Sequence, residues 1–321
     1  MNASWYFTAP WDPVPMRRGD ALGLRAGADY FAELIAPGLS NASSDARWIT
    51  LLSWCLKWSH VVWQNTGGGD LTRRDEQRAR YAWLRPLELL WVDRTLESGQ
   101  TSGQLRGRRS LDRWRKEDRK FTNFAMSPDQ FRRYRQVGTY GAYRVMFRTV
   151  AGLTTDNDGW TPDATALKLA DLVNDSLPSA VRLKQEHFES STKRRHLTDD
   201  EASYWVKRGW PAAWEQADKG LFPTPDDKIA SLLPEQERGL LKPALFGDDS
   251  VRRLTAETLA SAKGARSHPE LCDALAGSDA IAKKIARESL APLPAFTRLA
   301  DAAMDAMRAL WAELNRDQEA Q

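Results

Sequence analysis

The sequence predicts a mainly α, multi-helical protein that contains one small winged-helix-like unit. Apolar residues recur at spacings of three and four along most of the 321 residues, as expected for helices with one buried face. Ser, Thr and Asp residues in capping positions precede these segments, and stretches rich in Gly or Pro follow them. The segment GLTTDNDGWTP, residues 152–162, interrupts the helical pattern and has the composition of a tight turn.

Composition indicates a folded globular protein. Hydrophobic residues make up 42 % of the chain and charged residues 28 %, which excludes the composition of a disordered chain. The 14 Trp residues are expected mostly in the core or at interfaces. Cys55 and Cys272 form no CxxC pair, so neither a disulfide framework nor a zinc site is indicated.

The first domain is expected to be helical and to span residues 1–98. Its first helix is predicted over about residues 20–36. The residues that would form its buried side are Tyr30, Phe31, Leu34 and Ile35. The apolar run at residues 48–63 contains Lys57 and His60 and is short for a membrane span, so we expect a buried helix there. Because the N-terminal residues also lack the pattern of a secretory signal, we expect a cytoplasmic protein without membrane contact.

A third helix is expected to begin after Thr72 and to end near Gly99, with a kink or division at Pro86. Residues 99–110, GQTSGQLRGRRS, have no apolar period and are rich in Gly, Ser and Arg. We expect them to form a mobile loop. This loop opens a second domain, residues 99–190, which would also contain the winged-helix-like unit.

The winged-helix-like unit is predicted from the order of its elements. A helix over residues 128–137, a turn at VGTYG and a second helix over residues 140–151 match a helix-turn-helix. A short β-hairpin near residues 153–161 would form the wing, and a further helix would begin at Thr161 and Pro162. The same segments are also compatible with a protein docking module or with a plain surface turn, and these alternatives remain open.

The Asp-rich turn does not fit a calcium-binding loop. An EF-hand needs oxygen ligands from acidic residues at loop positions 1 and 12 and a Gly at position 6. With Gly159 at position 6, positions 1 and 12 are Thr154 and Thr165. The sequence therefore favours a turn or hairpin, since Asn, Asp and Gly tolerate a positive φ angle.

A third, helical domain is expected over residues 191–321. Thr198 and Glu201 form a capping box for a helix that would end at Gly209. Short helices separated by Pro and Gly are expected next, followed by a closing helix over about residues 294–315. The apolar residues of this last helix include Leu299, Met304, Met307 and Trp311.

Charge is distributed unevenly along the chain. Residues 71–148 hold 19 Lys and Arg against 9 Asp and Glu, a net charge of +10, whereas the whole chain has a net charge of +3. The flanks are slightly acidic, with net charges of −1 for residues 1–70 and −6 for residues 149–321. A basic middle segment is typical of a protein that binds nucleic acid, here most readily duplex DNA. Arg side chains scattered over solvated faces would give the same count.

Eight arginines of the basic segment are the candidate nucleic-acid contacts. Arg144 and Arg148 lie four residues apart on the predicted second helix, where they could reach phosphates or guanine edges of a duplex. The candidates for phosphate contacts are Arg106, Arg108, Arg109, Arg132, Arg133 and Arg135. The Arg-rich loop can equally be a solvated linker.

No catalytic residue, metal ligand or cofactor site is predicted. The four His residues form no HExxH or HxH pattern. The chain also contains no phosphate-binding loop and no nucleophile elbow. A metal-dependent nuclease is kept as an alternative, with Asp112, Asp118 and Lys120 as its candidate residues.

The first sixty residues contain the most distinctive text of the chain. PMRRGDALGLRAGADYFAELIAPGLSN, DARWITLLSWC and the later GTYGAYR and WTP stretches resemble bacterial accessory proteins whose genes lie near helicases and nucleases in phage-defence or mobile-element islands. The resemblance implies an accessory subunit beside a helicase or nuclease subunit, and it transfers no catalytic residues. The favoured function is therefore a non-catalytic nucleic-acid-binding adaptor of an anti-phage defence complex. A protein–protein interaction scaffold without nucleic-acid binding is the other alternative.

Overall fold

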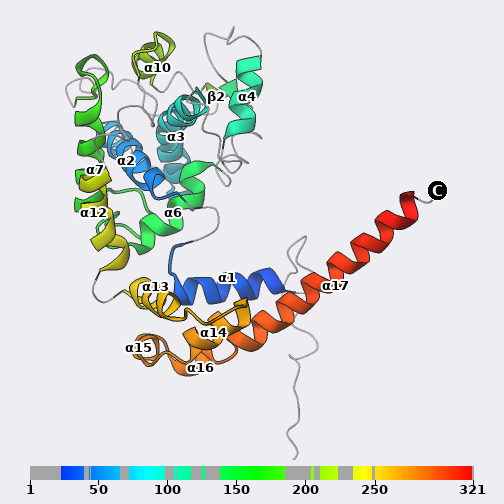
Figure 1. The fold of residues 1–321 in the computed structure, drawn as a ribbon. Helices are drawn as coiled ribbons and strands as arrows, with labels where there is room; N and C mark the ends of the chain where they lie inside the picture. The colour runs from blue at the N-terminus through cyan, green and yellow to red at the C-terminus, as the bar shows by residue number, and fades with distance from the viewer. Residues whose placement is uncertain are drawn as a thin grey trace, which may run out of the picture. The chain divides into compact units, whose positions relative to one another are not determined.

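The computed structural model describes residues 23–39, 43, 45–65, 72–97, 105, 107–116, 125–126, 138–184, 204–205, 210–222, 234–247 and 250–319. Most of these residues lie in α-helices (Figure 1), which confirms the mainly α class. The chain divides into two compact units, Gly38–Asp248 and a unit that joins Met1–Pro37 to Asp249–Gln321. These boundaries differ from those expected after residues 98 and 190, because α1 (Leu24–Ile35) packs on helices from the C-terminal part of the chain.

The larger unit is a cluster of packed helices with one small pair of strands. Its helices are α2 (Arg47–Asn65), α3 (Arg73–Glu97), α4 (Arg108–Lys116), α6 (Thr139–Thr149), α7 (Ala164–Ser176), the 3-10 helix η1 (Ser179–Val181), α10 (Pro211–Asp218) and α12 (Pro234–Phe246). Helix α2 packs against α3, α6 and α7, while α4 and α10 pack on α3 and α12 packs on α7. Strands β1 (Ala125–Met126) and β2 (Tyr204–Trp205) pair antiparallel.

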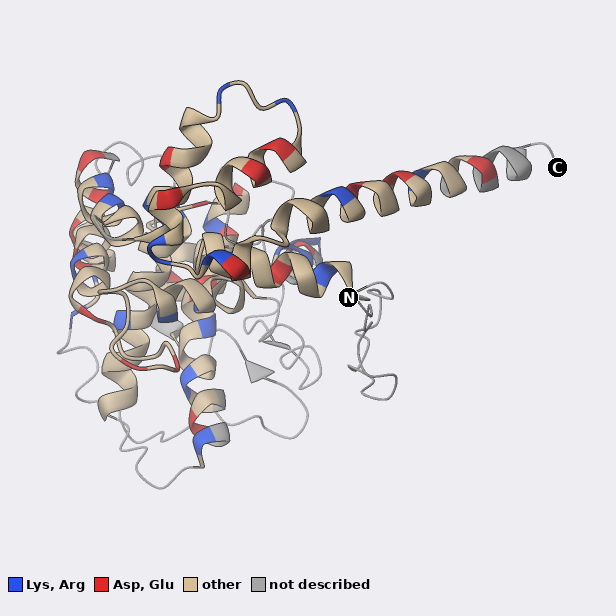
Figure 2. Ribbon diagram, turned by 90° about the horizontal axis from the view of Figure 1, so that it is seen from below, with Lys and Arg blue, Asp and Glu red and all other residues tan. Residues whose placement is uncertain are grey.

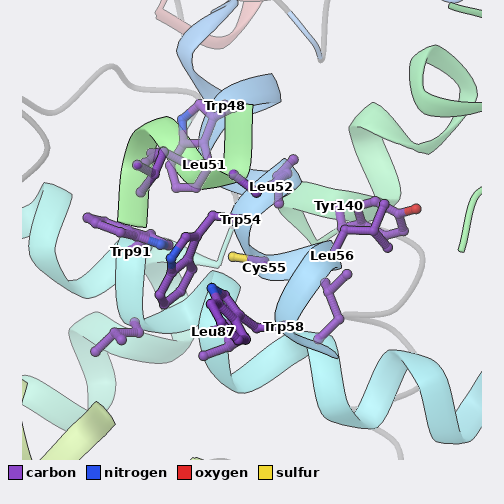
Figure 3. Packing of buried hydrophobic residues seen from close by; sticks show 14 of the residues in the cluster. Trp48, Leu51, Leu52, Trp54, Cys55, Leu56, Trp58, Leu87, Trp91 and Tyr140 are labelled. Atoms are coloured by element: carbon purple, nitrogen blue, oxygen red, sulfur yellow. The ribbon is translucent and has the colours of Figure 1, made fainter. Parts of the chain in front are cut away.

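Helix α2 forms the centre of the larger unit. Its sequence is apolar around nearly its whole circumference, so it can be buried on every side. This agrees with the buried helix expected at residues 48–63. The ring of Trp54 is fully buried and meets the rings of Trp91 and Phe222 edge-on, at 5.7 and 6.0 Å between centroids. Figure 3 shows Trp54 and Trp91 side by side among the buried Leu residues of α2 and α3. None of the described helices combines the length and the apolar composition that a membrane crossing requires.

Several element boundaries differ from the expected ones. Helix α3 runs through Pro86 without a break, so this residue does not divide it. Helix α4 begins at Arg108, inside the segment expected to be a loop. Helix α7 begins at Ala164, and its N-cap is Asp163 rather than Thr161. The Asp163 carboxylate accepts a hydrogen bond from the Ala164 N–H at 2.7 Å.

Two other expected elements involve residues that the structure does not describe. The predicted helix over residues 128–137 lies outside the described residues, and so does the capping box of Thr198 and Glu201. The helix predicted to end at Gly209 is wrong at Tyr204–Trp205, because these residues form β2. Aromatic residues favour the extended conformation when a partner strand is present, and here Trp205 lies opposite Ala125.

The smaller unit consists of short helices and one long helix. They are α1, α13 (Val251–Ser261), α14 (His268–Ala276), α15 (Asp279–Ala282), α16 (Arg287–Leu290) and α17 (Leu293–Glu319). Ser250, Ser267 and Ser278 precede α13, α14 and α15, and each side chain accepts a hydrogen bond from a backbone N–H of the following helix. Serine at the N-cap thus sets where these three helices begin.

Helix α1 is held in the smaller unit by its apolar face and its C-terminal end. Phe31 is buried in the core of this unit, whereas Tyr30 is 53 % exposed and does not lie on the buried side as we expected. The Thr255 hydroxyl donates to the Ile35 carbonyl at 2.6 Å, and the Arg252 guanidinium donates to the Pro37 carbonyl at 2.9 Å. These bonds satisfy carbonyl groups at a helix end, which have no partner within the helix.

Candidate nucleic-acid interface

Helix α4 is a basic helix that is fixed to the core by two apolar residues. Leu111 and Trp114 lie three residues apart and are 0 % and 2 % exposed. The Trp114 ring meets that of Trp214 edge-on, with 5.9 Å between centroids. Burying a Leu and a Trp side chain contributes several kcal/mol to docking the helix. One face of α4 therefore packs against the core, and the opposite face carries its charged residues.

An ion pair fixes α4 to the C-terminal half of α3. Arg115 donates from Nε to the Asp93 carboxylate at 2.8 Å and from Nη2 to the Asp93 carbonyl at 2.5 Å. The Asp93 side chain is only 3 % exposed, so water screens this pair little. A second acidic residue, Glu97, lies 3.6 Å from the same guanidinium. Arg115 is therefore occupied within the fold.

The outer face of α4 presents cations. Arg109 and Lys116 are exposed, and among the described residues neither has an acidic partner. Arg108 pairs with Asp112 at 3.1 Å, but both side chains are about 40 % exposed. Such a surface pair contributes little to stability, so a phosphate could replace Asp112 at Arg108. Two of the predicted phosphate contacts, Arg108 and Arg109, thus lie on a solvent-facing helix.

Arg144, predicted to contact a duplex, instead holds the Asp-rich loop. Its Nε donates to the Asp158 carbonyl at 2.8 Å, and its guanidinium carbon lies 4.9 Å from the centroid of the Trp160 ring. The Tyr140 hydroxyl donates to the Gly159 carbonyl beside it. Arg148 lies one turn further along α6 and is exposed. Of the two predicted duplex contacts, Arg148 alone projects a charge into solvent.

The Asp-rich loop is closed by one carboxylate. Asp156 accepts hydrogen bonds from the backbone N–H groups of Asp158 at 2.9 Å, Trp160 at 2.9 Å and Thr161 at 2.5 Å. Burial raises the pKa of this carboxyl, but the hydrogen bonds, chiefly from Thr161, outweigh burial and leave the pKa lowered. This is an Asx-type turn, in agreement with the surface-turn alternative.

The strand pairing in this loop is limited to a single bridge. Thr154 and Pro162 form the bridge, and the Thr155 N–H donates to the Thr161 carbonyl at 3.0 Å. Among the described residues this bridge does not extend into a pair of strands. The β-hairpin expected as the wing of a winged helix is therefore not shown. Trp160 is 4 % exposed and lies in the core, which fixes the loop against α3 and α6.

The basic residues near the loop and those on α4 lie toward opposite ends of α3. Arg73, at the start of α3, donates to both Asp158 carboxylate oxygens, at 2.7 and 3.1 Å. Asp93, which holds α4, lies 20 residues further along the helix. At 1.5 Å per residue the two points are about 30 Å apart. Figure 2 accordingly shows Lys and Arg interspersed with Asp and Glu along the helices, not gathered in one field.

The remaining predicted residues can be placed only in part. Arg106, Arg132, Arg133 and Arg135 all lie outside the described residues. Of the nuclease candidates, Asp118 and Lys120 also lie outside them, and Asp112 is paired with Arg108. Within the described part of the chain, no group of three or more His, Cys, Asp or Glu residues is arranged to hold a metal ion.

Sequence reasoning missed a charged residue in the core. Glu88 is 0 % exposed, and its Oε2 accepts a hydrogen bond from the Tyr140 N–H at 2.9 Å. The N-cap of α6 is Gly138, which has no side chain, so a carboxylate from α3 caps α6 instead. Burial, with the nearby charge of Glu88, raises the pKa of Cys55 well above its ordinary value. Cys55 is therefore a protonated core thiol, which is a poor nucleophile.

Comparison of the chain with protein-family models, curated proteins and solved structures finds no match. A function is therefore inferred from the side chains themselves. The feature that bears most directly on a charged partner is the anchored helix α4 with its exposed cations.

Proposed function

We propose that this protein is a non-catalytic adaptor that binds nucleic acid, with duplex DNA as the expected ligand, through the outer face of α4. The observation that carries the proposal is the anchoring of a basic helix: Leu111, Trp114 and the Arg115–Asp93 pair hold α4, and Arg109 and Lys116 face solvent. Cations on a fixed helix lose less conformational freedom on binding phosphates than cations on a flexible segment.

The other candidate residues enter the proposal by their position. Arg106 lies two residues before the start of α4 in the sequence, and with Arg132, Arg133 and Arg135 it is proposed to contact phosphates. If α6 bound a duplex as the recognition helix of a winged helix, Arg148 would face the DNA, since Arg144 is turned toward the Asp-rich loop. We therefore keep Arg148 as a duplex contact and assign Arg144 to the support of the loop.

The proposed setting is a cytoplasmic anti-phage complex with a helicase or nuclease subunit as protein partner. Its support is the resemblance carried by the N-terminal segment, together with the net charge of −6 on residues 149–321. An acidic part beside a basic part is compatible with two different partners.

One observation favours the scaffold alternative. Helix α17 exposes four large apolar side chains, Leu299, Met304, Met307 and Leu310, by 46 to 64 %. Exposed apolar residues gathered on one helix mark a protein contact more often than a nucleic-acid contact. A scaffold would bind protein through α17 and would not need the cations of α4.

The test is binding of fluorescent duplex and single-stranded DNA to three proteins across a salt series, with and without Mg²⁺. The variant R109E/K116E reverses the two exposed cations of α4. Its matched control, K168E/K242E, makes the same charge change at exposed positions of α7 and α12, outside the basic segment. Circular dichroism verifies that both variants are folded.

The two phosphate contacts of Arg109 and Lys116 define the expected effect. Each contact contributes about 0.9 to the slope of log K against log salt. Relative to 1 M salt, two contacts therefore raise the affinity roughly 30-fold at 0.15 M salt. R109E/K116E should lose at least that much, and the control should lose clearly less. Equal losses in the two variants would remove α4 from the interface. No binding by the wild type would favour the scaffold, and Mg²⁺-dependent cleavage would favour the nuclease.

A further inference from the structure

Helix α17 is amphipathic over residues 293–310. At 100° per residue, the four exposed apolar residues Leu299, Met304, Met307 and Leu310 fall within an arc of about 140°. Their side chains are 62, 46, 48 and 64 % exposed, respectively. The charged residues Arg298, Asp301, Asp305 and Arg308 fall in the opposite arc. The helix therefore has one apolar face and one charged face, as a helix does that packs against another element.

The apolar face begins inside the smaller unit and continues beyond it. Leu293 is 4 % exposed, and the Phe296 ring lies 5.2 Å from that of Phe31 on α1. These two residues lie in the same arc as Met307 and Leu310. Figures 1 and 2 both show α17 extending past the other helices of its unit. The first turns of the face are thus covered by α1 and α14, and the later turns are not covered by described residues.

The charges of α17 leave the face neutral. Arg298 pairs with Asp273 of α14 at 2.6 Å, and Arg308 pairs with Asp305 at 3.1 Å. Both pairs lie off the apolar arc. An occupant with charges at its centre would lose their hydration without gaining a partner. The face is therefore suited to another neutral apolar helix.

The spacing of the face is complementary to itself. Ala300, Ala303, Met307 and Leu310 follow one another at intervals of three, four and three residues, which is the a and d pattern of a coiled coil. When two copies are aligned antiparallel about Met307, each Ala303 lies opposite Trp311 of the other copy, and each Met304 lies opposite Leu310. A small residue against a large one fills the space between two helices. A parallel alignment would set Ala303 against Ala303 and leave that layer underfilled.

We propose that the free part of α17 binds the same helix of a second copy of this chain, antiparallel and centred on Met307, to form a homodimer. The shared stretch is short, about 16 Å from Leu299 to Leu310. Interfaces of this size lie at the low end of those found in specific complexes. The dimer should therefore form reversibly in the micromolar range.

Sedimentation velocity of the full chain between 1 and 100 μM tests the proposal. The variant M307E/L310E places charges on the apolar face. The control A302E/A309E adds the same charges at exposed positions of the same helix, on the charged face. We expect the wild type and the control to shift from monomer to dimer together, and M307E/L310E to remain monomeric at a tenfold higher concentration. A monomeric wild type, or a variant that dimerises like the wild type, would overturn the proposal.

Cross-linking tests the orientation. Oxidation of M304C/L310C should join Cys at position 304 of one copy to Cys at position 310 of the other, identified by mass spectrometry of the linked peptides. Dominant 304–304 or 310–310 links would show a parallel pair and would overturn the antiparallel arrangement. The DNA-binding variants of α4 are measured separately, so failure of the dimer leaves the proposed function to be judged on its own result.

Discussion

Arg144 and Arg148 lie one turn apart on α6, and the same substitution should destabilise the fold at the first position only. Replacement of Arg144 by Met keeps the hydrocarbon chain that lies beside Gly159. It removes the hydrogen bond to the Asp158 carbonyl and the cation over the Trp160 ring. At the exposed Arg148 the same replacement removes only a solvated charge. We therefore expect R144M to destabilise the larger unit and R148M to leave it unchanged.

The size of the effect follows from these two contacts. A hydrogen bond from a charged donor contributes about 1.5–3 kcal/mol when buried, and a cation–π contact contributes about 0.5–2 kcal/mol. Because Arg144 is only half-buried, we use the lower parts of both ranges, which together give about 2 kcal/mol. In a unit of this size 1 kcal/mol changes Tm by roughly 2–4 °C. R144M should thus lower Tm by roughly 4–8 °C, and R148M should change stability by less than about 0.5 kcal/mol.

Thermal unfolding followed by circular dichroism, with urea midpoints as a second measure, checks this prediction. DNA binding of the two folded variants is then measured below the lower Tm. Equal stability of R144M and R148M would refute the role assigned to Arg144. A loss of DNA affinity in R144M without a loss of stability would return Arg144 to the list of duplex contacts.

Three further perturbations address the loop and the core. Gly159 has φ of +78°, and a Cβ there would lie 3.0 Å from the Arg148 Cγ, so G159A should cost about 1–2 kcal/mol in urea unfolding. The pKa of Asp156 is lowered in the folded chain, so its carboxylate stabilises the fold above its ordinary pKa. This contribution is lost as the pH falls through the folded pKa. In D156N the urea midpoint should therefore depend less on pH below about pH 4 than it does in the wild type. Removal of the Glu88 carboxylate in E88A should cost about 2–4 kcal/mol, because the buried Tyr140 N–H loses its acceptor and a cavity is left. E88Q, which keeps an acceptor oxygen, should lose less, and equal losses would contradict the capping role.

The helices that could be predicted from the sequence are those whose apolar pattern alone shows which of their faces are buried. The run at residues 48–63 is apolar on all sides, so no neighbour has to be known to infer that it is buried. The closing helix was also predicted within a few residues, because its apolar spacing and a Pro near its start mark it locally. The partner of α1, by contrast, lies more than 200 residues away in the chain, and no local pattern indicates it.

The site was harder to predict because equivalent residues take different partners. Arg144 and Arg148 have the same type, helix and predicted face, and only the return of the loop at Gly159 separates their roles. Glu88 lies in an apolar run of the sequence, and no neighbouring residue indicates that its carboxylate caps another helix. That function depends on Gly138, 50 residues further along the chain, having no side chain to offer. Both outcomes are set by tertiary contacts that leave no periodic signal.

The net charge of the basic segment overstates the cations available to a partner. Arg73 holds Asp158, Arg80 pairs with Glu76, and Arg115 holds Asp93, while Arg85 is buried in the core. Among the described side chains of the segment, the exposed cations that have no acidic partner are Arg109, Lys116 and Arg148.

The salt dependence of DNA binding can therefore count the contacts. Three phosphate contacts correspond to a slope of about −2.7 in log K against log salt. A slope near that value would be explained by Arg109, Lys116 and Arg148 alone. A slope of about −6 would require roughly four more cations. Those that the basic segment can still supply include Arg106, Arg132, Arg133 and Arg135, so charge reversal of these four should then bring the slope back to about −3.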